Sequence, residues 1–101
     1  MGNSKPARQR RRDALLWVLE HLPDPMAPFT THDVLAVAES LQQTKWPPYL
    51  KSAWRHVSAR QADSVGLALG RHPSVEKLEG VENRQRHGVR TRSQRWQRRS
   101  E

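Results

Sequence analysis

Arginine is the residue that stands out in this chain of 101 residues, which has 18 Lys and Arg, 10 Asp and Glu, and a formal net charge of +8. The cations gather at the two ends, because residues 1–12 hold five bases and no acid, and residues 84–101 hold seven bases and one acid. Residues 13–83 hold six bases and nine acids. Eleven of the twelve terminal bases are arginine, whose planar fork matches phosphate and guanine edges. The ends therefore predict contact with a polyanion.

Two groups of arginines are the candidate contacts. Near the C-terminus they are Arg84, Arg86, Arg90, Arg92 and Arg95, and near the N-terminus they are Arg10, Arg11 and Arg12. Arginine is electrostatically favoured in a narrow minor groove, and a basic arm can follow a groove of a duplex. The alternative is a pair of solvated tails that only keep the protein soluble.

The sequence has no pattern typical of a catalytic or metal site. It contains no cysteine, its five histidines lack the spacing of metal ligands, and no glycine-rich phosphate loop is present. We therefore expect no enzyme activity, no cofactor and no metal. No apolar run approaches the length of a membrane span, and no cleavable signal follows the basic N-terminal stretch. We expect no membrane partner and a cytoplasmic or nucleoid-associated location, or a nuclear one in a eukaryote.

Helical periodicity marks four segments, and the length allows one domain. The first segment is carried by Leu15, Val18, Leu19 and Leu22 and ends at Pro23 and Pro25. A second helix begins at a capping box of Thr30 and Asp33 and runs to about Gln42. A third covers residues 49–57, and a fourth starts at Ala59 behind a capping box of Ser58 and Gln61 and ends at Arg71.

A β-hairpin is expected after Pro73, where the period of the apolar residues changes. Its strands are predicted over residues 75–81 and 89–97, and Gly80, Glu82, Asn83 and Gly88 supply turn chemistry between them. Val75 and Leu78 have opposite parity, so either a bulge interrupts the first strand or one strand is short.

Short helices followed by a basic hairpin resemble a winged helix-turn-helix domain over residues 11–97, after a disordered basic arm at 1–10 and before a basic tail at 98–101. The fold class is then mainly α with a C-terminal β-hairpin (α+β). The resemblance implies that the helix before the hairpin enters a DNA major groove and that the hairpin, the wing, contacts the backbone or the minor groove. The helix at 49–57 lengthens the usual connection to the recognition helix.

Under that resemblance the segment from Ala59 to Arg71 is the recognition helix. Its apolar residues Ala62, Val65 and Leu69 point to the core, and the side that faces outward carries Arg60, Gln61, Ser64, Leu67 and Arg71. Arginine pairs with guanine, glutamine with adenine and serine with either, so this set suits reading of base edges. An ordinary solvated helix face is the alternative.

The expected partner is double-stranded DNA, and two other partners are kept open. An RNA-binding or ribonucleoprotein assembly protein would use the same basic ends, and a protein-interaction module would use Leu67 and the tryptophans. A homodimer also remains open. Among the tryptophans, we expect Trp54 in the core, Trp96 between the last strand and the helices, and Trp46 partly exposed.

Overall fold

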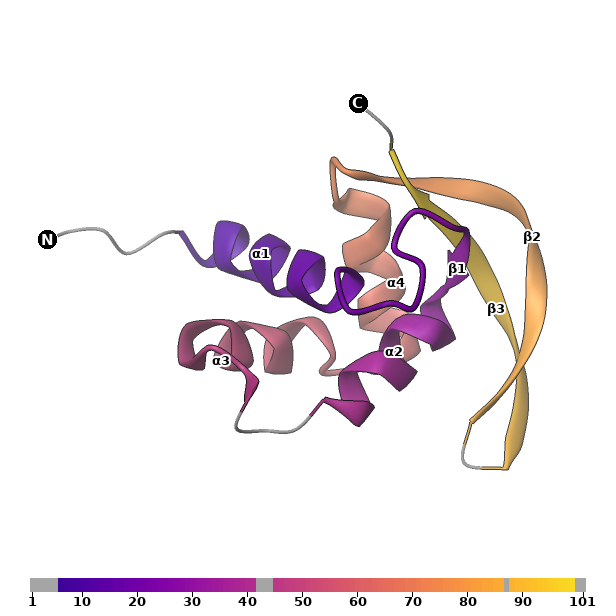
Figure 1. Ribbon diagram of the computed structural model, residues 1–101, viewed down its shortest axis with the longest axis horizontal. Coiled ribbons are helices and arrows are strands. Elements are labelled where there is room, and N and C mark those ends of the chain that lie inside the picture. Colours follow the sequence, from indigo (N-terminus) through magenta and orange to yellow (C-terminus); the bar gives the residue numbers. More distant parts are fainter. Residues whose placement is uncertain (1–5, 42–44, 87, 100–101) are drawn as a thin grey trace, which may run out of the picture.

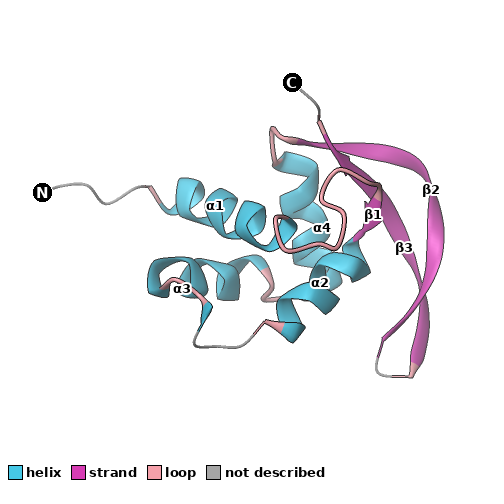
Figure 2. Cartoon of the chain, in the orientation of Figure 1, coloured by secondary structure: helices cyan, strands magenta, loops and turns pink. Residues whose placement is uncertain are grey.

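The computed structural model describes residues 6–41, 45–86 and 88–99. Its elements follow in the order α1 (Ala7–Leu19), β1 (Phe29–Thr30), α2 (Thr31–Ser40), α3 (Pro48–Val57), α4 (Ala62–Arg71), β2 (Val75–Arg86) and β3 (Val89–Arg98). The helices gather on one side, and the antiparallel sheet curves around the side of α2 and α4 (Figure 1 and Figure 2). The expected α+β class, with a hairpin at the C-terminal end, is confirmed.

Helix α1 begins earlier than the sequence predicts. The segment up to residue 10 is expected to be a disordered arm, but the chain is helical from Ala7, so Arg10, Arg11 and Arg12 lie on a helix. Alanine, arginine and glutamine are strong helix formers, and the amide of Gln9 donates to a carboxylate oxygen of Asp13 over 3.0 Å, one turn along. Residues 1–5 lie outside the described residues.

Helix α2 begins at the predicted capping box. The backbone N–H of Asp33 donates to the hydroxyl of Thr30 over 3.1 Å, and the backbone N–H of Thr30 donates to the carboxylate of Asp33 over 2.9 Å. Thr30 also ends strand β1, which the sequence does not predict. This strand pairs with β3 through Phe29↔Trp96 and Thr30↔Arg95. A strand of two residues has no periodicity to detect, and its partner lies far along the chain.

The sheet has the order β1-β3-β2, and β2 with β3 forms the expected hairpin. The predicted turn at residues 80–83 is wrong, because those residues belong to β2 and the register continues to the pair Arg86↔Val89. The expected irregularity is present as a shift of register between Lys77 and Val81. Gly80 lies in this shift and has a φ of +85°. Any residue with a side chain would be strained in that backbone conformation.

Helix α4 begins three residues later than expected. Ser58 is predicted to cap it, but its hydroxyl donates to the carbonyl of Trp54 over 2.8 Å and so closes the end of α3. Residues 58–61 form a turn, and Gln61 precedes the helix with a φ of +50°. Arg60 and Gln61 therefore lie on the turn before α4, and only Ser64 and Arg71 of the predicted reading set lie on the helix itself.

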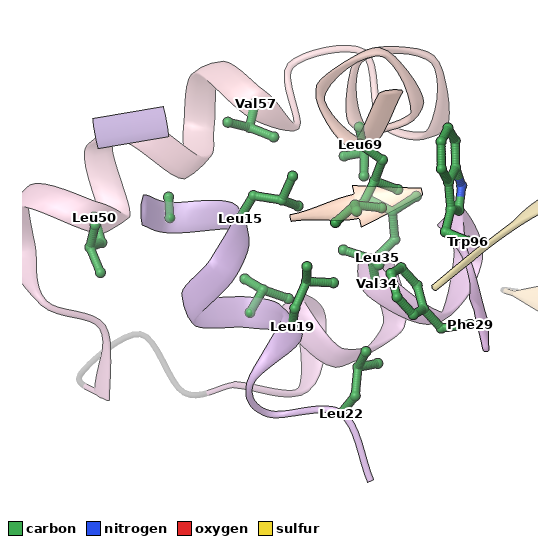
Figure 3. Packing of buried hydrophobic residues seen from close by; sticks show 14 of the residues in the cluster. Leu15, Leu19, Leu22, Phe29, Val34, Leu35, Leu50, Val57, Leu69 and Trp96 are labelled. Carbon is green, nitrogen blue, oxygen red and sulfur yellow. The ribbon is translucent and has the colours of Figure 1, made fainter. Parts of the chain in front are cut away.

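The core runs between the four helices and reaches the sheet at α2 and α4 (Figure 3). Its largest fully buried apolar side chains are Leu15, Val18, Leu19, Val34, Val65 and Leu69. Trp96 packs β3 onto the helices, as predicted. Its indole N–H donates to the hydroxyl of Thr31 over 2.8 Å, and its ring comes within 3.7 Å of the position that a Cβ on Gly70 would take.

Three tryptophans join α1 to α3. Trp46 is expected to be partly exposed, but only 8% of it is accessible, because its ring packs 4.3 Å from that of Trp17 and 5.9 Å from that of Trp54. Trp54 is partly buried against the core. Aromatic pairs at these separations are stabilising, so the cluster holds α3 against α1.

The capping box gives a direct test of the fold. Changing Thr30→Ala and Thr30→Ser removes the same methyl group from a fully buried site, but only Ser keeps the hydroxyl that caps α2. We expect Thr30→Ala to be less stable than Thr30→Ser by about 1 kcal/mol. Urea unfolding of the two variants measures the difference, and equal midpoints would show that the cap contributes nothing.

Candidate nucleic-acid interface

Helix α4 presents one apolar side to the core and a second side to solvent. Val65 and Leu69 are fully buried, whereas Asp63, Leu67 and Arg71 are exposed. Leu67 has 60% of its surface accessible, as exposed as Val89 of β3 at 59%. The helix that precedes the hairpin is thus accessible along its length.

A groove of about 770 Å³ runs along α4 between α1 and the end of α3. We name it the arginine groove; the side chains that define it are Arg8, Arg11 and Arg12 of α1, His56 of α3, and Leu67 and Arg71 of α4. Among the described residues that line it, none is acidic. The groove therefore combines four guanidinium groups with an exposed apolar side chain.

Some arginines form an ion pair with a carboxylate and others do not. Within the described residues, Arg8, Arg11, Arg12 and Arg71 have no ion-pair partner, and the same holds for Arg90 and Arg92 of β3. Unpaired guanidinium groups keep their full capacity to bind phosphate. Arg10, the remaining predicted contact of the N-terminal group, does not line the groove.

Arg84 and Arg95 are paired, although the sequence predicts them as contacts. Arg84 lies 3.0 Å from a carboxylate oxygen of Asp33 and 3.0 Å from one of Glu82, and Glu82 also lies 3.0 Å from Arg95. The hydrogen bond to Asp33 raises the pKa of Arg84 above its usual value. The pair with Asp33 connects the hairpin to the start of α2, and Glu82 joins Arg84 of β2 to Arg95 of β3 within the hairpin, so both arginines have a structural role.

The end of the hairpin reaches past α2 in Figure 1, and the residues just before it, Arg84 and Thr91, still contact α2. The pairs Asn83↔Arg92 and Gln85↔Arg90 share one face of the ribbon, because paired residues of antiparallel strands point to the same side. The pair Arg84↔Thr91 lies on the other face, toward α2. Arg90 and Arg92 are exposed, and the side chain of Arg86 lies outside the described part of the chain.

The turn before α4 meets the hairpin at a cleft of about 390 Å³. Arg60, Gln61 and Asp63 line it from the turn and the first residues of α4, and Val89 and Thr91 line it from β3. Ser64 is engaged in this turn, since its hydroxyl accepts from the backbone N–H of Arg60 over 2.9 Å and donates to the carbonyl of Gln61 over 3.3 Å. The predicted reading set is therefore split, with Arg60 and Gln61 beside the hairpin and Arg71 in the arginine groove.

His72 holds α1 against the end of α4. Its Nε2 lies 3.3 Å from the carbonyl oxygen of Arg12, and its Nδ1 accepts from the backbone N–H of Ser74 over 3.0 Å. The imidazole that makes both bonds is neutral, with its proton on Nε2. Burial lowers the pKa of His72, and the charges of Arg12 and Arg98 lower it further, against the opposing effect of the bond to Arg12. The ring is thus a neutral link between two elements of the groove.

The described residues contain no group of three His, Asp or Glu that is close enough to hold a metal. In the same part of the chain, no helix has both the length and the apolar character needed to cross a membrane.

The neutral state of His72 predicts how stability depends on pH. Because its pKa is lower in the folded chain than in the unfolded chain, where it is near the usual value of about 6.5, the unfolded state takes up the proton first. The contribution of His72 is present above that value and is lost as the pH falls through the folded pKa. We expect His72→Gln, which does not titrate, to lose less unfolding free energy than the unchanged chain between pH 7.5 and pH 5. Parallel profiles from urea unfolding would contradict this assignment.

No known protein family, curated protein or solved structure matches this chain. A function for this surface must therefore come from its own charge, shape and hydrogen bonds.

Proposed function

We propose that this chain is a winged-helix protein that binds double-stranded DNA, with α4 as the recognition helix and the β2–β3 hairpin as the wing. The order of the elements supports this, because a short strand follows the first helix, and the helix before the hairpin has an exposed side. The sheet order β1-β3-β2 joins that short strand to the returning strand of the wing. Helix α3 is an addition between α2 and α4.

The observation that carries the proposal is the distribution of the unpaired arginines around α4. One group lines the arginine groove on one flank of the helix, and Arg90 and Arg92 lie on the wing, whose strand β3 meets the turn at the start of α4. The carboxylates of Asp33 and Glu82 form ion pairs with Arg84 and Arg95. A duplex lying on α4 would meet the groove arginines on one flank and Arg60 on the other, with Arg90 and Arg92 on the outer face of the adjacent wing.

Each predicted contact then has a role. Arg60 and Gln61 read base edges from the turn, where arginine suits guanine and glutamine suits adenine. Ser64 orients this turn through its two hydrogen bonds. Arg90 and Arg92 contact the phosphates or the minor groove, and Arg84 and Arg95 hold the wing in position.

The exposed Leu67 favours a second candidate, a protein-interaction module. In that candidate Leu67, with 60% of its surface accessible, is the apolar contact for a partner protein. In the DNA proposal the same side chain contacts a thymine methyl group. Binding to DNA of random sequence separates the two candidates, since a protein-interaction module has no need of it.

The wing is tested by the salt dependence of binding to a random duplex of 20 base pairs. Arg90→Gln with Arg92→Gln removes two unpaired cations, so the slope of log affinity against log salt should fall by about 0.9 for each phosphate that these side chains neutralise. Lys51→Gln with Arg55→Gln removes two charges from α3 and is the matched control. A slope unchanged by the wing variant excludes the wing from the interface, and single-stranded DNA and structured RNA are the comparison ligands.

Sequence reading is tested at the turn. We expect Arg60→Ala with Gln61→Gly to reduce discrimination between selected and random duplexes by about 1–3 kcal/mol for each base that the two side chains read. Glycine is chosen at position 61 because the φ of +50° is unstrained for it, so the turn is retained. Affinity for random DNA should change much less. Discrimination equal to that of the unchanged chain would rule out these residues as readers.

A further inference from the structure

We propose that the arginine groove binds consecutive phosphates of one DNA strand, so that α1 is a second element that contacts the backbone, on the opposite flank of α4 from the wing. This inference rests on the proposed function for the source of the phosphates. The site is made by three elements, α1, α3 and α4, and α3 is the element that a plain winged helix lacks.

Electrostatics identify the ligand as an anion. Arg8, Arg11, Arg12 and Arg71 converge on one groove, with His56 beside them, and no acidic side chain is among the described residues that line it. Cations gathered without counter-charges repel one another, which destabilises the free protein. Elsewhere in the same molecule, carboxylates are placed against Arg84 and Arg95. The unneutralised groove is therefore suited to a ligand that brings its own negative charge.

Helical geometry gives these cations a spacing that suits a phosphodiester chain. Arg8, Arg11 and Arg12 stand at i, i+3 and i+4, which places them on one face of α1. Four residues of helix rise about 6 Å, and successive phosphates of one DNA strand advance about 3.4 Å along the duplex axis, so the three cations span about two phosphates. The bond between His72 and the Arg12 carbonyl fixes this part of α1 against α4.

The position of the groove favours a DNA backbone over an acidic peptide. A helix with its side chains is about 10–12 Å across, and the major groove is about 12 Å wide, so a helix that enters it has a phosphate backbone on each flank. α4 has arginines at both flanks: those of the groove, and Arg60 in the cleft between its first turn and the wing. An acidic helix docked on Leu67 would account for one flank only.

The first experiment locates the anion without relying on duplex binding. The Nε–Hε signals of the arginines are followed by NMR as inorganic tripolyphosphate is added at low salt. We expect saturable shifts of Arg8, Arg11, Arg12 and Arg71, with Arg84, Arg95 and Arg55 little changed. Equal shifts at every exposed arginine, or no saturation, would overturn the site.

The second experiment uses matched triple variants in binding to a duplex of 20 base pairs. Arg8→Gln, Arg11→Gln and Arg12→Gln remove three charges from the groove, and Lys45→Gln, Lys51→Gln and Arg55→Gln remove three charges outside it. We expect the groove variant to bind roughly tenfold or more weakly, with a salt slope smaller by about 2–3 units, and the control to change far less. Circular dichroism checks that α1 remains folded. Equal effects of the two variants overturn the proposal.

The two sets of measurements separate this site from the proposed function. If duplex binding depends on Arg90 and Arg92 but not on the groove arginines, the proposal of DNA binding is kept and the proposal of a phosphate site in the groove is overturned. Tripolyphosphate in the groove of a protein that binds no duplex supports a phosphate site and overturns its assignment to DNA. A glutamate-rich helical peptide that occupies the groove more tightly than the duplex does would replace the phosphate backbone as its ligand.

Discussion

The carboxylate of Asp33 connects the three parts of the molecule on which the rest of the structure depends. One of its oxygens accepts the backbone N–H of Thr30, at the junction of β1 and α2, and the other accepts the Nε–H of Arg84 on β2. The same residue supplies the backbone N–H that the Thr30 hydroxyl accepts. A single acidic side chain therefore sets the start of α2, ends the short strand that pairs with β3, and holds the hairpin against the helices.

This use of Asp33 also decides which cations are available to a ligand. Asp33 and Glu82 are committed to Arg84 and Arg95, and these pairs are about one-third exposed, where their contribution to stability is small. Their effect is on position, because the pair of Arg84 with Asp33 holds the half of the hairpin nearer its tip against α2. The arginines beyond their reach, on β3 and in the groove, keep their charge for other partners.

Local signals in the sequence predict the parts of the fold that local interactions decide. The Thr30 capping box, the helix over residues 49–57 and the register shift in β2 follow from residues close together in the chain. The predicted cap at Ser58 is wrong because the carbonyl of Trp54 competes for its hydroxyl. Strand β1 and the burial of Trp46 depend on partners far along the chain, Trp96 of β3 and Trp17 of α1, and no local pattern indicates them.

The candidate site shows the same division. The abundance of arginine at both ends can be read from the sequence, but not which arginines are neutralised, since Asp33 lies 51 residues from Arg84. The sequence predicts a disordered arm over residues 1–10, whereas Arg8 lines the groove because α1 begins at Ala7. The periodicity of Arg8, Arg11 and Arg12 with Leu15 is the signal that would extend the helix by one turn.

Helix α3 links the groove to the turn that precedes α4. The tryptophan cluster fixes α3 on α1, and α3 contributes His56 to the groove before the chain reverses through residues 58–61. That reversal ends at Gln61 with a φ of +50°, a conformation that costs a non-glycine residue about 1 kcal/mol or more. Glycine would adopt it without strain, so the glutamine side chain is retained at a cost, which agrees with the role proposed for it in reading a base. The added helix thus positions both the proposed phosphate contact and the turn proposed to read bases, because it forms one wall of the groove and precedes the turn directly.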